Sequence, residues 1–220
     1  MELYVSEFSR YVMALLITLY TYECFAVFRY EDEDQRKGIY LRQNLLMFAF
    51  HFSCFLVICF ETGDITYLFF YAFQEIMLYA VIMLFRMLYP KSNRLVVNNM
   101  CMLLAIGFVI LTRLDFSKAV KQFIIATGSM GIALLVPLFI RKFKFLKSLK
   151  WLYALGGIFA LSIVMILGQT TYGSKLSYSI AGITFQPSEF VKIVFVFFVA
   201  SALYEAAGFF EVFTTAVIAA

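Results

Sequence analysis

Long apolar runs, separated by short polar stretches, extend over almost the whole sequence. A helix needs roughly 17 to 25 mainly apolar residues to cross the hydrocarbon core of a bilayer, and about seven segments approach or meet that length. These segments are residues 8–28, 43–60, 66–85, 95–112, 123–140 and 151–168, and one that starts near Phe190. The runs are continuous, whereas the strands of a membrane barrel alternate between apolar and polar positions. The pattern therefore predicts an all-α fold, a polytopic bundle of transmembrane helices.

The composition excludes an ordinary soluble domain. Of the 220 residues, 63% are hydrophobic, 19% are aromatic and only 15% are charged, whereas a soluble domain carries about 25% charged residues. The four cysteines lie inside apolar runs without metal-ligand spacing, so neither a disulfide nor a metal site is predicted. The net charge of +4 comes from basic residues in short loops. This distribution favours a role in membrane orientation and argues against a nucleic-acid partner.

The positions of lysine and arginine predict the orientation, because basic residues are retained on the cytoplasmic side of a membrane. If the N-terminus lies outside, the cytoplasmic loops hold twelve basic residues: Arg29, Arg36, Lys37, Arg42, Arg86, Lys91, Arg94, Arg141, Lys142, Lys144, Lys147 and Lys150. The opposite side then holds six: Arg10, Arg113, Lys118, Lys121, Lys175 and Lys192. We therefore expect a multi-pass protein with its N-terminus outside the cell and residues 169–189 in an extracellular loop.

Two ionisable residues interrupt the expected spans near their middle. His51 lies in the second span and Glu75 in the third, and such groups are costly in lipid unless they face a partner or a cavity. A buried hydrogen bond that joins the two helices is the simpler interpretation, and a proton relay is the functional one. Elsewhere, Gly156 and Ala160 are four residues apart, which predicts close helix packing.

The end of the loop over residues 169–189 carries a well-defined helix start. Residues 185–192 read Phe-Gln-Pro-Ser-Glu-Phe-Val-Lys. Pro187 suits the first helical turn, and Ser188 and Glu189 place acceptor groups at the positive end of the helix dipole. Glu189 and Lys192 share a helical face, where they can pair, and at the head of a span Lys192 is expected to be partly buried.

This block resembles the Phe-Gln-Pro-Ser-Glu-x-x-Lys element of the SEDS family (shape, elongation, division and sporulation), which includes FtsW, RodA and SpoVE. A second segment in register, Leu103 to Gln122, is similar to the first helix and first extracellular loop of the family, and it includes Arg113, Lys121 and Gln122. The resemblance covers roughly residues 95–220. Residues 1–94 are then expected to form three additional N-terminal transmembrane helices.

The resemblance implies a peptidoglycan glycosyltransferase of the bacterial plasma membrane, which polymerises lipid II or another undecaprenyl-linked substrate. It implies a class B penicillin-binding protein and membrane lipids as partners, no cofactor within this chain, and leaves a divalent cation open for the full enzyme. The catalytic aspartate of the family is expected beyond Ala220, where the chain looks truncated. Residues expected to shape the substrate cavity are Lys175, Gln186, Pro187, Ser188, Glu189 and Lys192.

The sequence departs from the family pattern at one place, and two other functions are compatible with it. The family commonly has Arg-Trp after its Gly-Ala-Lys element, but here Lys175 is followed by Leu-Ser-Tyr, which weakens any substrate contact carried over to this stretch. A transporter or flippase for a lipid-linked intermediate would suit His51 and Glu75. A non-catalytic scaffold for a penicillin-binding protein is the second alternative. The sequence does not distinguish elongation, division and sporulation.

Overall fold

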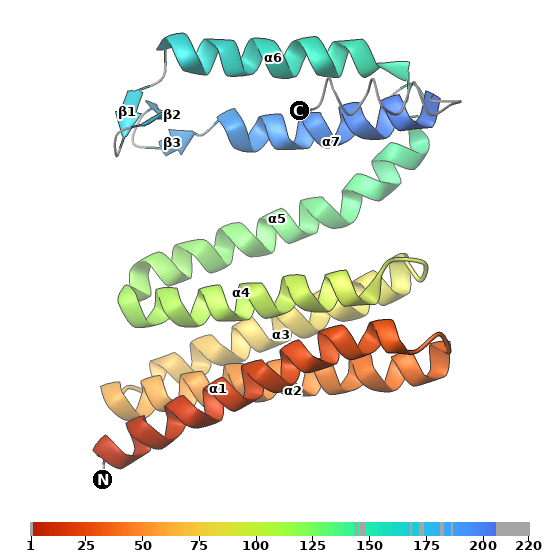
Figure 1. The fold of residues 1–220 in the computed structure, drawn as a ribbon. Coiled ribbons are helices and arrows are strands. Elements are labelled where there is room, and N and C mark those ends of the chain that lie inside the picture. The colour runs from red at the N-terminus through yellow and green to blue at the C-terminus, as the bar shows by residue number, and fades with distance from the viewer. Residues whose placement is uncertain are drawn as a thin grey trace. The chain divides into compact units, whose positions relative to one another are not determined.

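Seven α-helices and three short strands form the described part of the chain (Figure 1). The computed structural model describes residues 2–143, 145, 148–167, 169–171, 174–180, 183–185 and 187–205, with side chains at 7–143, 145, 148–163 and 189–204. The helices are α1 (Glu2–Ala26), α2 (Glu33–Thr62), α3 (Thr66–Leu88), α4 (Arg94–Leu114), α5 (Phe116–Lys142), α6 (Lys150–Leu167) and α7 (Pro187–Glu205), with a 3₁₀ turn at Val27–Arg29. The strands are β1 (Gln169–Thr171), β2 (Ser174–Ile180) and β3 (Ile183–Phe185).

The helical-bundle prediction is confirmed. Within the described residues, five helices are long and apolar enough to cross a membrane: Glu7–Arg29, Glu33–Thr62, Thr66–Leu88, Arg94–Leu114 and Phe116–Lys142. The sixth and seventh expected segments correspond to α6 and α7, of 18 and 19 residues. The loop between these two helices adds a small antiparallel sheet in the order β1-β2-β3, which the sequence did not predict.

The chain divides into an N-terminal unit, residues 1–135, and a C-terminal unit, residues 136–220. In the N-terminal unit α2 packs against α1, α3 and α4. Its largest apolar cluster includes Met47, Leu78, Cys101, Ala105 and Phe108, each almost inaccessible to solvent. Large apolar side chains such as Phe73 and Leu103 are exposed on the outside of the bundle, as expected where lipid is the solvent.

Side-chain caps fix where the helices of the N-terminal unit begin. Asp32 accepts a hydrogen bond from the backbone N–H of Asp34 at 3.2 Å, so α2 begins ten residues before its apolar segment, at Glu33. Asp64, in the connection before α3, accepts from the N–H of Thr66 at 2.8 Å. Asp115, before α5, accepts from the N–H of Lys118 at 3.0 Å. Hydrogen bonds from Thr66 and from Lys118 hold the pKa of each exposed carboxyl, Asp64 and Asp115, below its ordinary value.

Gly63 shows why α2 can turn directly into α3. Its φ of 66° lies in the left-handed region, and its N–H donates to the carbonyl of Cys59 at 2.9 Å. Glycine adopts this conformation without the penalty that a Cβ atom brings. Two further residues then suffice to reach α3.

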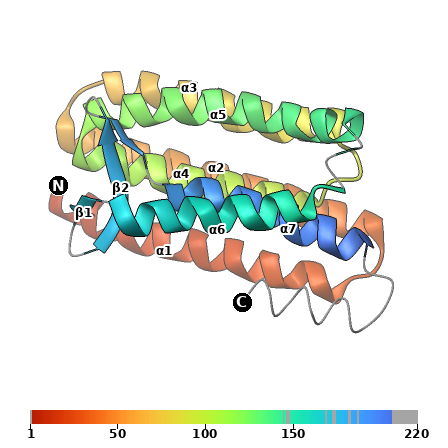
Figure 2. The same cartoon turned by 90° about the horizontal axis from the view of Figure 1, so that it is seen from above.

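In the C-terminal unit α6 and α7 form an antiparallel pair. Figures 1 and 2 both show the three strands at one end of this pair. Gly157 of α6 is buried, and a Cβ atom there would lie 3.8 Å from Val194 and 3.9 Å from Val191 of α7. Gly156, the glycine expected at the interface, is exposed and has no such neighbour. The close approach of the two helices is therefore centred one residue later than the sequence predicted.

Gly157→Leu should destabilise the α6–α7 pair by about 1–3 kcal/mol, because the side chain beyond Cβ would overlap the two valines. Gly157→Ala should be tolerated, since its Cβ would make ordinary contacts. Unfolding in detergent can be followed by the fluorescence of Trp151, the only tryptophan of the chain and a residue of α6. Gly156→Leu is the matched control, and equal losses in the two leucine variants would contradict this packing.

Candidate functional site

A buried polar cluster joins α2 to α3 at His51. The ring is completely buried, and its Nδ1 atom lies 3.0 Å from Glu75 Oε2. Its Nε2 atom lies 3.0 Å from Gln74 Oε1. The rings of Phe55 and Tyr71 pack beside it, with centroids 5.0 and 5.2 Å away. The structure thus brings together the two ionisable residues that the sequence singled out, and adds Gln74 as a third member.

The hydrogen bonds constrain where the protons of this cluster lie. An amide oxygen accepts only, so a contact between Gln74 Oε1 and His51 Nε2 requires a proton on Nε2. A single proton then lies between Nδ1 and Glu75, held either by the carboxyl group or by the ring. In both states the cluster has no net charge. The opposite amide orientation would make Nε2 the acceptor and Nδ1 the donor to Glu75.

Gln74 and Glu75 differ in how far their side chains are buried. Gln74 is completely buried, and its Nε2 atom has no hydrogen-bond partner in the part of the chain that the structure describes. The Glu75 side chain is 26% exposed, while that of His51 is 0% exposed. The cluster therefore reaches from the closed core to the edge of the bundle through Glu75.

A second polar network, which the sequence did not predict, joins α1, α2 and α4. Asn98 Nδ2 donates to Gln43 Oε1 at 2.9 Å, and Gln43 Nε2 contacts Cys24 Sγ at 3.7 Å. Cys24 Sγ and the Tyr20 hydroxyl both donate to Asn99 Oδ1, at 3.1 and 2.9 Å. The signal that could have found it is the pair of amide doublets, Gln43-Asn44 and Asn98-Asn99, inside apolar runs, since polar side chains join helices in membranes.

The residues expected at the substrate cavity are only partly described. Lys175 lies in β2, with its backbone opposite Thr170, and Pro187 and Ser188 begin α7 as expected. The side chains of these three residues, and Gln186 as a whole, lie outside the described residues. Lys192 Nζ lies 2.7 Å from Glu189 Oε1, and the two side chains are 70% and 60% exposed. The expectation that Lys192 is partly buried was therefore wrong, because this face of α7 has no packing neighbour over the pair among the described residues.

Three further residues of the predicted set belong to the N-terminal unit. Arg113, near the end of α4, lies 3.6 Å from Glu61 of α2, and both side chains are substantially exposed. Lys121 and Gln122 are exposed on α5. No group of three or more His, Cys, Asp or Glu side chains suited to a metal ion occurs in the described part of the chain.

A family model described as "Cell cycle protein", for FtsW, RodA and SpoVE, matches residues 66–219. No match was found among curated proteins or among solved structures. The matched range begins with α3 and includes both segments on which the resemblance was based. The division of the chain at residues 94 and 95 stays a prediction.

Replacing His51 by leucine should cost about 1–3 kcal/mol of stability, because it removes the hydrogen bonds of the ring to buried Gln74 and to partly buried Glu75. The double variant His51→Leu/Glu75→Leu should be more stable than His51→Leu alone, since it also removes the carboxyl group that has lost its contact with the ring. Unfolding in mixed micelles, followed by circular dichroism, measures both. Phe52→Leu, at an exposed neighbouring position of α2, is the control. A double variant less stable than the single one would show that the carboxyl group is not held by the ring.

Proposed function

This chain belongs to the FtsW/RodA/SpoVE family of cell-cycle membrane proteins, and from that premise we propose that it serves in the polymerisation of peptidoglycan from lipid II. In this reaction a hydroxyl oxygen of one lipid-linked disaccharide forms a glycosidic bond to the sugar of another. The hydroxyl proton passes to a base, the bond from that sugar to its diphosphate breaks, and the lipid diphosphate leaves. The observation that carries the proposal is the family match over residues 66–219, which contains the block at 185–192.

The start of α7 is the part of this chain that we assign to the substrate. Pro187 and Ser188 begin the helix, and Glu189 and Lys192 are paired and largely exposed beside it. An exposed ammonium group near the leaving diphosphate would offset its negative charge as the glycosyl bond breaks. Glu189 would then position Lys192, and Lys175 and Gln186 would contribute from the loop that precedes the helix.

Transport of a lipid-linked intermediate is the second candidate, and the cluster of His51, Gln74 and Glu75 favours it. Ionisable groups in the middle of a span often carry protons in transporters. A flipping assay with labelled lipid II in vesicles separates the two activities, because a transporter moves the lipid without joining sugars. A class B penicillin-binding protein is the partner that we propose for either activity.

We propose that the protein lies in the bacterial plasma membrane with its N-terminus outside. The beginning of α2 and the α3–α4 connection lie at the same end of the N-terminal unit, where residues from both line one pocket. Seven of the twelve basic residues assigned to the cytoplasm lie in these two regions or within a few residues of them: Arg29, Arg36, Lys37, Arg42, Arg86, Lys91 and Arg94. We call this the basic end of the N-terminal unit. The retention of basic residues in the cytoplasm supports this orientation.

Cysteines placed at residues 3, 117 and 175 should react with a membrane-impermeant maleimide in intact cells, whereas Ser92→Cys should not. Ser92 lies at the basic end, and Ser117 is the second residue of α5, at the opposite end of the same unit. The unmodified chain, with its four native cysteines, gives the background. Labelling at 92 but not at 117 would reverse the orientation, and labelling at only one of 3 and 175 would overturn the assignment of three additional helices.

Glu189→Ala should abolish the formation of glycan strands from purified lipid II while membrane insertion stays intact. An exposed ion pair contributes only about 0–1 kcal/mol, so its loss should not unfold the protein. The assay uses the protein as its gene encodes it, including any residues that follow Ala220. Expression level and monodispersity in detergent are measured alongside.

The matched control is Glu7→Ala, which breaks a pair of the same spacing with Arg10 on α1, where the side chains are 58% and 72% exposed. This control should polymerise normally. If Glu189→Ala also polymerises normally and is well folded, the block at 185–192 is only a helix start.

A further inference from the structure

A surface pocket with a volume of about 320 Å³ lies at the basic end of the N-terminal unit. One wall is the first two turns of α2, which contribute Glu33, Arg36, Lys37 and Tyr40. The other wall is the α3–α4 connection and the first residue of α4, which contribute Lys91 and Arg94. Four cationic side chains and a single carboxylate therefore line one cavity.

Three of the four cations that line the pocket, Arg36, Lys91 and Arg94, form no ion pair in the described part of the chain. Lys37 Nζ lies 2.7 Å from Asp34 Oδ1, and Arg36 Nε donates to the backbone carbonyl of Tyr30 at 2.6 Å. That bond gives Arg36 no countercharge. For Lys91 and Arg94 the described part of the chain shows no carboxylate within ion-pair distance. The lining therefore carries four cations against one carboxylate. Of the neighbouring acidic side chains Glu31, Asp32 and Asp34, the described part of the chain shows an ion pair only between Asp34 and Lys37.

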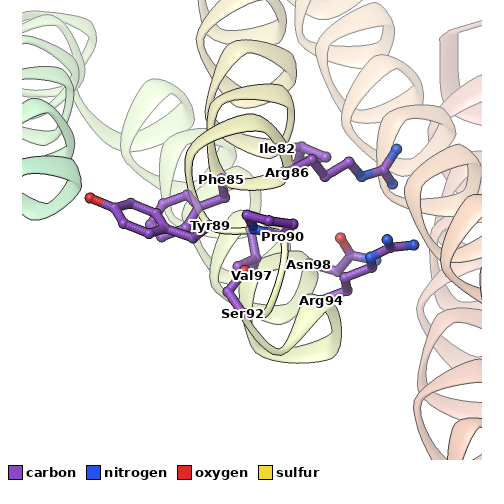
Figure 3. A pocket seen from close by; sticks show the side chains of 9 residues that line it. All are labelled: Ile82, Phe85, Arg86, Tyr89, Pro90, Ser92, Arg94, Val97 and Asn98. Atoms are coloured by element: carbon purple, nitrogen blue, oxygen red, sulfur yellow. The ribbon is translucent and has the colours of Figure 1, made fainter. Parts of the chain in front are cut away.

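A fifth cation extends the pocket along α3. A smaller cavity of about 10 Å³ shares Pro90, Ser92 and Arg94 with the larger one and is also lined by Arg86. Figure 3 shows the guanidinium groups of Arg86 and Arg94 on the same side of the α3–α4 connection, while Tyr89 points to the other side. Two planar groups that can each bind a phosphate through two hydrogen bonds therefore line the same small cavity.

We propose that this pocket binds the phosphate-bearing headgroup of an anionic phospholipid. Phosphate oxygens match the guanidinium and ammonium donors, and the volume accommodates a headgroup rather than a phosphate alone. The position agrees with a lipid, because α2 begins and α3 ends beside the pocket, at the level where headgroups meet the ends of the spans. Basic pockets between transmembrane helices bind such headgroups. The site lies outside the residues assigned to lipid II and does not depend on the polymerase proposal.

The purified protein in detergent can be titrated with cardiolipin, phosphatidylglycerol and phosphatidylcholine, with bound lipid counted by native mass spectrometry. We expect cardiolipin and phosphatidylglycerol to bind more tightly than phosphatidylcholine. Lys91→Gln/Arg94→Gln should weaken cardiolipin binding about 25- to 30-fold, or about fivefold for each charge removed. The matched control is Arg10→Gln/Lys118→Gln, which removes two exposed cations elsewhere on the same unit and should leave binding unchanged.

A variant that fills the pocket distinguishes binding in the cavity from a general attraction between the basic surface and anionic lipid. It also provides a test if the double variant Lys91→Gln/Arg94→Gln folds poorly. Ser92→Phe keeps every charge but occupies the cavity, so it should also weaken cardiolipin binding. Equal losses in the two glutamine double variants, no loss in Ser92→Phe, or equal binding of phosphatidylcholine would overturn the proposal. Inorganic phosphate is the remaining probe: if millimolar phosphate displaces cardiolipin completely, the site binds a free anion and the assignment to a lipid is wrong.

Discussion

The structure depends on the requirement that polar groups inside a bilayer find their partners within the protein. Helix α2 meets this requirement on three sides: His51 bonds to α3, Gln43 bonds to α4, and Gln43 also contacts Cys24 of α1. Apolar contacts alone discriminate weakly between helix faces in lipid, since the tails are as apolar as the side chains. Hydrogen bonds of this kind contribute about 0.6 kcal/mol each on average. Their main effect is therefore to select which faces of α1, α3 and α4 turn towards α2.

The sequence predicted the helices well because the bilayer sets a length that apolar runs must reach. It predicted the beginning of α2 poorly, because residues 33–38 are polar or glycine and the Asp32 cap begins the helix there, before any long apolar run. The strands between α6 and α7 were missed for a related reason. Residues 169–185 are a mixture of polar and apolar positions without a regular alternation through the whole segment, although β1, β2 and β3 pair there.

Some contacts of the candidate site could be predicted from the sequence, and others could not. The contact between His51 and Glu75 could be predicted because two costly groups at the same depth on consecutive helices have few other solutions. Gln74 could not, since an uncharged amide next to a carboxylate gives no signal of which one faces the ring. The exposure of Lys192 was also beyond the sequence, because the spacing to Glu189 defines a shared helical face but not what covers it. The geometry of the site does not identify the family, which comes from the match to the cell-cycle protein model over residues 66–219.

The length of α2 determines how the protein fits the thickness of its membrane. The helix has 30 residues and is therefore about 45 Å long, whereas the hydrocarbon layer is about 30 Å thick. Its continuous apolar part, residues 43–60, spans about 27 Å and matches that layer without a large tilt. The first turns of α2, residues 33–42, then extend beyond the hydrocarbon layer into the headgroup region and carry Arg36 and Lys37 there. In a bilayer a few ångströms thicker, these charged turns would enter the hydrocarbon layer. The protein should therefore partition towards membrane regions of ordinary or reduced thickness.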